Sequence, residues 1–133
     1  MSAATLKTSQ EWASQSQYDI DTALSLLKSK RRIYCVFMCH LALEKMLKAV
    51  FAKKKSAYPP HTHDLLFLAE QGEITFADEA QGYFVEELNG LNIPTRYPDQ
   101  LQKMLKRFTP KKTDEIYRST KKVLSWLKKN YLN

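Results

Sequence analysis

The stretch from Arg32 to Lys55 predicts one long helix whose apolar residues are spread nearly all round its axis. Such a helix has no polar face to expose to solvent, so it belongs at the centre of a bundle, covered by other helices. Three glycines and five prolines are few for 133 residues, so other long helices can also run without interruption. The chain has the length of one domain, and no alternating strand pattern occurs in it. We therefore predict an all-α fold, a single helical bundle over residues 1–133.

A carboxylate lies in the apolar stripe of this central helix. At about 100° per residue, Glu44 shares one broad face with Leu43 and Leu47, and His40 is a second polar group on that face. Burying a carboxylate is costly unless it is paired and hydrogen-bonded. The alternative is an ordinary exposed pair with Lys48, one helical turn further on, which stabilises a helix only slightly. Because Glu44 is central in the stripe, we expect it to be buried with a partner from outside the helix.

Asp19 presents the same problem on the preceding helix, which we expect to run from a cap at Thr8 or Ser9 to about Lys28. The inward face of that helix contains Trp12, Ser16, Ile20, Ala23 and Leu27. Asp19 lies on the same face, so it also needs a buried partner. For both carboxylates the candidate partners are Lys48, His63 and Arg96.

Turn signals divide the rest of the chain into shorter elements. Pro59 and Pro60 each lack an N–H donor, so they place a loop at residues 57–62. Thr62 is the expected cap of the next helix, and Gly72 its stop. The predicted elements after the loop are helices at 63–71 and 76–91, an irregular stretch at 92–109 with a helical turn or two, and a last helix at 110–131. The core candidates of the helix at 76–91 are Tyr83, Phe84 and Leu88.

The net charge of +7 favours anionic partners such as RNA, nucleotides or an acidic protein. A solvated lysine face on the last helix is the alternative explanation. No segment has the roughly 18 apolar residues that a spanning helix needs, and the polar N-terminus does not resemble a signal peptide. We therefore expect a cytoplasmic protein without a membrane partner. In that reducing compartment Cys35 and Cys39 should be buried free thiols.

Candidate metal ligands occur close together in two places, at His61, His63 and Asp64 and at Cys35, Cys39 and His40. Neither spacing matches a zinc motif, so we expect no metal site. For His63 two roles remain open, a structural ring that hydrogen-bonds inward to a carboxylate and a functional one. For Arg96 two roles also remain open, because a guanidinium either anchors its loop to a helix carboxylate or offers its fork to a phosphate. No glycine-rich phosphate loop occurs in the sequence.

Four short segments occur in a recognisable order. They are Trp12 followed by Asp19, Leu43-Glu44-Lys45-x-x-Lys48, Thr62-His63-Asp64-Leu65-x-x-Leu68 and Arg96-Tyr97-Pro98-Asp99. In this order and spacing they resemble HEPN domains, the "higher eukaryotes and prokaryotes nucleotide-binding" family. The resemblance covers about residues 8–130. It implies an up-and-down bundle of about five helices that is usually a homodimer.

The resemblance also implies two classes of function. Some relatives act beside a minimal nucleotidyltransferase, often as a toxin–antitoxin pair, and bind nucleotides or another polyanion. Others are metal-independent ribonucleases with an arginine, four to six further residues, and a histidine. In this chain seven residues separate Arg32 from His40, and no histidine follows His63. The ribonuclease spacing is therefore not found here.

We accordingly expect a regulatory module that binds a nucleotide or polyanion, forms a homodimer and docks a minimal nucleotidyltransferase. No cofactor is expected beyond a nucleotide ligand. The predicted buried polar cluster and ligand-binding residues are Asp19, Glu44, Lys48, His63, Arg96 and Tyr97. The alternative is an endoribonuclease toxin with a non-standard catalytic pair, His63 and Arg96, since cleavage needs an acid–base group and a cation at one phosphate.

Overall fold

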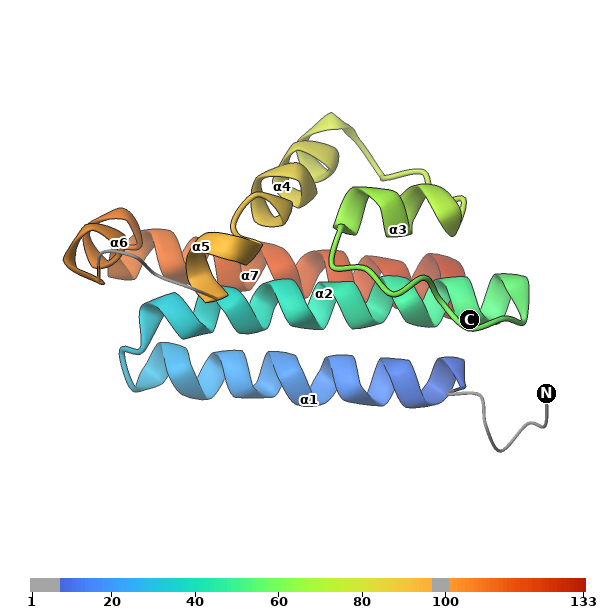
Figure 1. Ribbon diagram of the computed structural model, residues 1–133, viewed down its shortest axis with the longest axis horizontal. Helices are drawn as coiled ribbons and strands as arrows, with labels where there is room; N and C mark the ends of the chain where they lie inside the picture. The colour runs from blue at the N-terminus through green and yellow to red at the C-terminus, as the bar shows by residue number, and fades with distance from the viewer. Residues whose placement is uncertain (1–7, 97–100) are drawn as a thin grey trace.

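The structure, a computed structural model, describes residues 8–96 and 101–133. Three long helices lie side by side in it: α1 (Ser9–Lys28), α2 (Arg32–Lys55) and α7 (Pro110–Leu127) (Figure 1). A π-helical turn, Lys128–Leu132, continues α7. No strand occurs in the described part of the chain, and the predicted all-α bundle is confirmed. The bounds predicted for the first two helices agree with the structure.

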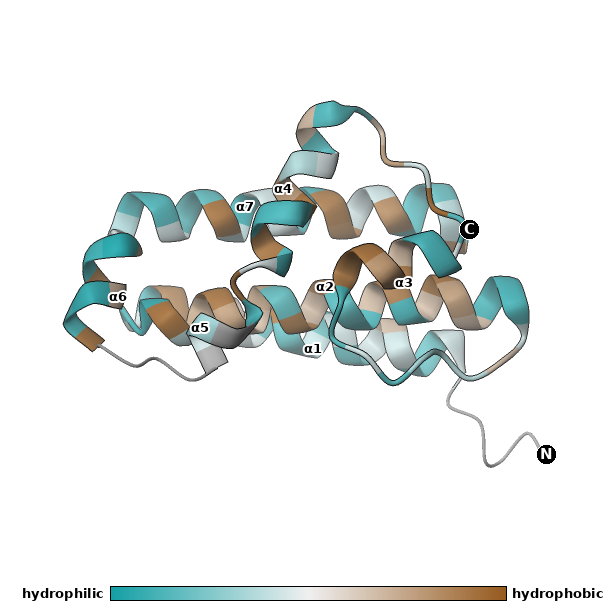
Figure 2. Ribbon diagram, turned by 45° about the horizontal axis from the view of Figure 1, so that its top comes forward, coloured by the Kyte–Doolittle hydropathy of each residue, from teal (hydrophilic) through white to brown (hydrophobic). Residues whose placement is uncertain are grey.

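The central position of α2 is also as predicted. α1 runs antiparallel to it, and the Ser9 and Ser16 hydroxyls each donate a 2.7 Å hydrogen bond to a carbonyl of α2. α7 starts at the same end of the bundle as α2 and runs in the same direction, because residues 56–109 bring the chain back (Figure 1). Hydrophobic and hydrophilic bands alternate along α7 (Figure 2), as an outer helix with one buried face requires.

Two short helices, α3 (Leu65–Gln71) and α4 (Glu79–Asn89), form a second layer over α2 (Figure 1). The prediction that Thr62 caps the first of them is wrong. Asp64 is the cap, because its Oδ1 accepts hydrogen bonds from the backbone N–H groups of Leu66 and Phe67. The helix therefore begins two residues later than predicted.

The helix predicted at 76–91 is shorter at both ends. Asp78 caps it by accepting a 2.8 Å hydrogen bond from the N–H of Gln81, so it begins at Glu79. Tyr83, a predicted core residue, is 66% exposed, and Val85 is buried in its place beside Leu88. Val85 and Leu88 are three residues apart, so they lie on the same face of the helix, and this face packs inward.

The irregular stretch contains α5 (Asn92–Arg96) and α6 (Leu101–Arg107). One side chain ties it to the start of α2. The Arg32 guanidinium donates from Nε to the carbonyl of Phe108 at 2.5 Å and from Nη2 to that of Leu105 at 3.1 Å. Those carbonyls lie at the end of α6, where no further helical turn satisfies them. Arg32 therefore holds α6 against the turn between α1 and α2.

Candidate functional site

Glu44, in the middle of α2, is the centre of a buried polar cluster. Its side chain is 4% exposed. Oε1 lies 2.8 Å from His63 Nδ1 and 4.0 Å from His40 Nδ1, and Oε2 accepts a 3.1 Å hydrogen bond from Lys48 Nζ. We call these four residues the Glu44 cluster. The prediction that Glu44 is buried with a partner from outside its own helix is confirmed.

Lys48 also connects the cluster to an aromatic group on its other side. Its Nζ lies 5.3 Å from the centre of the Trp12 ring on α1, a cation–π distance. Trp12 meets Tyr58 edge to face, with ring centres 6.0 Å apart, and Tyr58 stacks on His61 at 5.4 Å. The Lys48 ammonium is thus enclosed between a carboxylate and a ring, which leaves it little access to a phosphate.

His63 lies at the border between this interior and solvent. An ionised carboxylate only accepts hydrogen bonds, so the bond to Glu44 places a proton on Nδ1 and makes Nε2 an acceptor in the neutral ring. The His63 side chain is 53% exposed. It lines an open cavity of about 360 Å³ together with Thr62, Asp64, Asn89, Gly90 and Asn92. A buried carboxylate that orients a half-exposed imidazole can position an acid–base group or a hydrogen-bond acceptor for a ligand.

The predicted partners of Asp19 are wrong. Asp19 is buried, as predicted, but its Oδ2 lies 2.9 Å from Nζ of Lys45, which was not among the candidates. Lys45 follows Glu44 by about 100° round the helix, so the two neighbours point in different directions. The one cluster predicted from the sequence is therefore two ion pairs, one around Glu44 and one between Asp19 and Lys45.

The other two predicted site residues lie at the limit of what the structure describes. The backbone of Arg96 ends α5, and its side chain lies outside the described residues. Tyr97 lies outside them altogether. A ligand contact by either residue, and the catalytic pair of Arg96 with His63, stay predictions.

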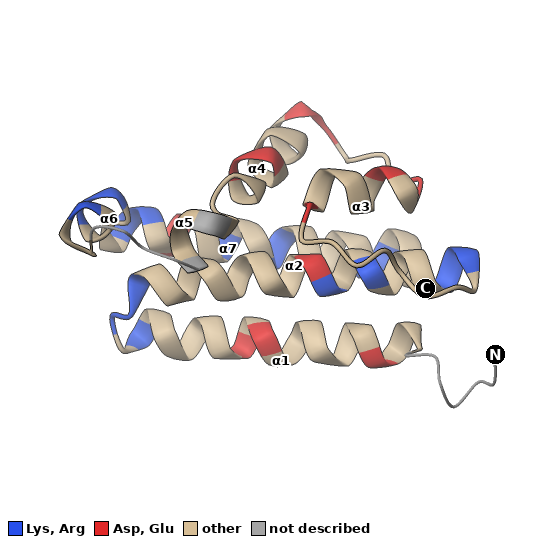
Figure 3. Ribbon diagram, viewed as in Figure 1, with Lys and Arg blue, Asp and Glu red and all other residues tan. Residues whose placement is uncertain are grey.

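A concentration of basic side chains at one end of the bundle was not predicted. The turn between α1 and α2, helix α6 and the first turn of α7 meet there, and Figure 3 shows Lys and Arg gathered on all of them. These residues are all exposed, and no salt bridge involves them within the described ranges. We call them the basic end: Lys28, Lys30, Arg31, Lys103, Lys106, Arg107 and Lys111.

The basic end is visible only in three dimensions, because about 70 residues of sequence separate its two parts. Arg32 is what brings them together, through the two carbonyls at the end of α6. The signal in the sequence was limited to two short runs of Lys and Arg, neither of which is unusual alone.

Cys35 and Cys39 are free and buried, as predicted. A hydrogen bond with Cys39 lowers the pKa of the Cys35 thiol, and the same bond together with burial holds the pKa of Cys39 well above its ordinary value. Both side chains are shielded from solvent, so neither is placed to react with a molecule in solution.

Metal-binding groups and membrane-spanning helices are both absent from the described part of the chain. It contains no group of three or more His, Cys, Asp and Glu side chains that could hold a metal ion. None of its helices has the length and apolar character needed to cross a membrane.

Comparison with known families gives one match. A family model described as "HEPN domain" matches residues 9–131, nearly the whole chain. No curated protein and no solved structure matches the chain. The match covers both ion pairs, the cavity beside His63 and the basic end.

The Glu44 cluster predicts a large loss of stability when the carboxylate is removed. Glu44→Ala leaves the Lys48 ammonium buried without its anion, so we expect the free energy of unfolding to fall by about 3–5 kcal/mol. Urea denaturation followed by circular dichroism measures this. The matched control is Glu70→Ala, an exposed glutamate on α3, which should change it by less than about 0.5 kcal/mol. Equal, small effects of the two substitutions would contradict the cluster.

Proposed function

The chain belongs to the HEPN-domain family, whose members are nucleotide-binding or ribonuclease-type proteins, and from this we propose that it is a polyanion-binding regulatory module. The observation that carries the proposal is the basic end, seven exposed Lys and Arg side chains without a described salt bridge. Cations presented together bind phosphates by releasing the counterions condensed on them. RNA or a nucleotide with several phosphates is the class of ligand that suits this surface.

The structure of the Glu44 cluster argues against Lys48, one of the predicted ligand-binding residues, as a contact for the phosphates of the ligand. Lys48 is 8% exposed and is already paired with Glu44, so it is a poor phosphate ligand. None of the seven side chains of the basic end forms a salt bridge within the described ranges, although Arg107 lines a cavity together with Glu86 and Glu87. We therefore place the phosphate contacts at the basic end and keep Arg96 as a further candidate.

The biological setting that we propose comes from the family resemblance. In it the protein is a cytoplasmic homodimer that acts beside a minimal nucleotidyltransferase, within a toxin–antitoxin system. A regulatory role fits the absence from the sequence of the arginine–histidine spacing of the family's ribonucleases.

An endoribonuclease is the second candidate, and one observation favours it. The Glu44–His63 pair holds an imidazole with Nδ1 fixed and Nε2 available, which is how a general base is prepared. Such an enzyme would still need a cation beside the same phosphate, the role assigned to Arg96.

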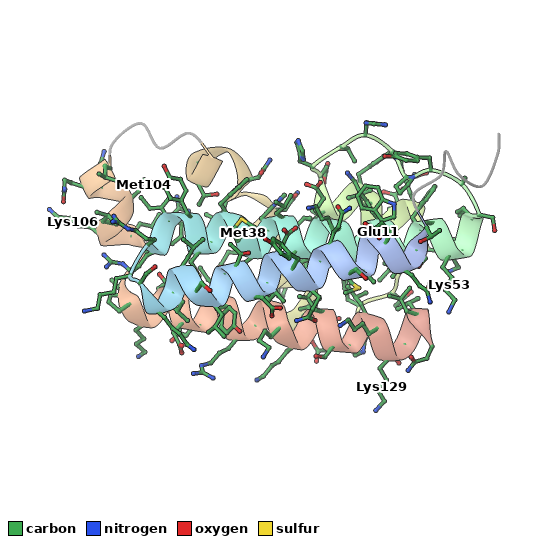
Figure 4. The ribbon with its side chains drawn as sticks, turned by 90° about the horizontal axis from the view of Figure 1, so that it is seen from below. Glu11, Met38, Lys53, Met104, Lys106 and Lys129 are labelled. Atoms are coloured by element: carbon green, nitrogen blue, oxygen red, sulfur yellow. The ribbon has the colours of Figure 1, made fainter. Side chains whose placement is uncertain are left out.

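The first prediction concerns the basic end. A single-stranded RNA of about ten nucleotides should bind, with log K falling linearly against log salt concentration. A variant in which Lys28, Lys103 and Lys106 are all changed to alanine should have a slope of log K against log salt that is smaller in magnitude by about 2. The reason is that each phosphate contact contributes about 0.7 to that slope. The matched control changes Lys121 and Lys122 on α7 and Lys129 in the π-helical turn that continues it. Figure 4 shows Lys106 and Lys129 near opposite ends of the molecule. Fluorescence anisotropy across a salt series measures the RNA affinity and its salt dependence for the parent and the two variants. Loss of binding only in the control variant would move the site to α7 and the turn that continues it.

The second prediction separates the two candidate functions. Purified protein should leave mixed RNA intact, because no arginine has a histidine at the family's catalytic spacing. Gel electrophoresis after incubation tests this, with His63→Ala and Glu70→Ala prepared identically. Cleavage by the parent and by Glu70→Ala, lost in His63→Ala, would replace the binding module by the enzyme.

A further inference from the structure

Three aromatic rings form a series that starts in the interior of the protein and ends in solvent. Trp12 on α1 is 6% exposed and meets Tyr58, which is 39% exposed, edge to face. Tyr58 stacks on the exposed His61, with ring centres 5.4 Å apart and an angle of 16° between the ring planes. Within the described residues His61 makes no other ring contact, hydrogen bond or ion pair. The series therefore ends in a flat ring that is open to solvent.

The loop that carries the two outer rings, residues 57–62, holds His61 in a restrained backbone. The loop runs back along α2 towards α3 (Figure 1), and its two consecutive prolines have restricted φ angles. The carbonyl of Pro60 accepts a 3.0 Å hydrogen bond from the N–H of Thr62, which closes a tight turn with His61 at its tip. Directly after the loop, His63 belongs to the Glu44 cluster. A ring that is held in place before binding loses little conformational entropy when a ligand packs on it.

A ring that is stacked on one face and open on the other suits a flat aromatic ligand. Every nucleobase has such a face, and unpaired bases stack on aromatic side chains, His among them. The neighbouring charges suit the phosphates of the same ligand, because Lys53, Lys54 and Lys55 end α2 just before the loop and are exposed. Lys54 and Lys55 pair with Glu73, which is 59% exposed. Exposed pairs contribute little stability, so a phosphate can replace this carboxylate at little cost.

The position of the rings relative to the basic end sets the length of the ligand. Trp12 lies near the start of α1 and Lys28 at its end, about 24 Å apart along the helix axis. A single nucleotide is too short to contact both places, whereas a strand of several nucleotides can do so. In a duplex the bases are already stacked and paired, so an unpaired strand is the polyanion that suits both features.

We propose that the His61 ring is a stacking site for an unpaired base of single-stranded RNA. The base lies on the face of His61 that does not contact Tyr58, and the phosphates of the strand contact the lysines at the end of α2 and the basic end. The inference rests on the polyanion binding proposed above and deepens it, because it selects a single strand over a nucleotide or a duplex.

The test uses the full chain and a single-stranded RNA of about ten nucleotides that contains the fluorescent base 2-aminopurine, whose emission falls when it stacks. A strand of the same length without bases keeps the phosphates and removes the partner of the ring. His61→Ala removes the ring, and His61→Phe restores a flat ring without the imidazole nitrogens. Tyr18→Ala is the matched control, because Tyr18 on α1 is 75% exposed and has no ring contact in the described part of the chain.

We expect His61→Ala to weaken binding of the ordinary strand about tenfold, the scale of one base on one ring, and to leave binding of the base-free strand unchanged. In His61→Phe both the affinity and the quenching of 2-aminopurine should return, and Tyr18→Ala should behave as the parent. Circular dichroism of each variant checks that the bundle is intact.

An unchanged affinity of His61→Ala for the ordinary strand would overturn the proposal, and an altered oligomeric state of that variant in sedimentation would then assign the ring to a protein contact. Equal losses with the ordinary and the base-free strand would overturn it too, because the ring would then act on the phosphates. Binding of neither strand to the parent would overturn the polyanion proposal and this inference with it. Binding of both strands that does not depend on His61 would overturn this inference alone.

Discussion

A buried carboxylate needs cations or donors around it, and Glu44 obtains them from two elements of the fold. Lys48 comes from its own helix and packs on Trp12 of α1, whereas His63 comes from the loop that leads into α3. The path of that loop over α2 is thus tied to one hydrogen bond, between His63 and Glu44. Similarly packed hydrophobic residues are often as stabilising as a buried ion pair, so stability alone does not explain a glutamate here. Its distinctive effect is to fix the orientation of the His63 ring.

The second organising feature is the separation of charge. Residues 64–95 carry seven acidic side chains and no basic ones, while the remaining residues carry all 21 basic side chains and seven acidic ones. The acidic part forms the layer of α3 and α4 over α2, and the basic end gathers where α6 meets the turn between α1 and α2 (Figure 3). Glu73 and Glu87 of this layer pair with lysines of α2 and α7, and the other acidic side chains of the layer form no described salt bridge. A protein with this distribution can hold a polyanion at the basic end, away from the acidic layer.

The sequence predicted the long helices well, because their hydrophobic periodicity and the caps at Thr8 and Thr109 are local signals. It also predicted that Glu44 is buried, with His63 as one of three candidate partners, and the structure places His63 against it. It missed Lys45 as the partner of Asp19, since which of two adjacent residues faces α1 depends on how the helices are rotated against each other. The starts of α3 and α4 were misplaced because several nearby residues can act as caps, and only the tertiary contacts choose among them. The basic end depends on the Arg32 contacts, which no local pattern reveals.

The claim that Glu44 fixes the His63 ring is tested most directly by nitrogen–proton correlation NMR of the histidine side chains. The measurement is made at a pH high enough to leave the ring neutral, on the parent and on Glu44→Gln. The structure predicts that His63 in the parent carries its proton on Nδ1, bonded to the carboxylate, with Nε2 bare. In Glu44→Gln, whose amide can donate as well as accept, this preference should weaken. A parent ring protonated on Nε2, or the same tautomer balance in both proteins, would contradict the account.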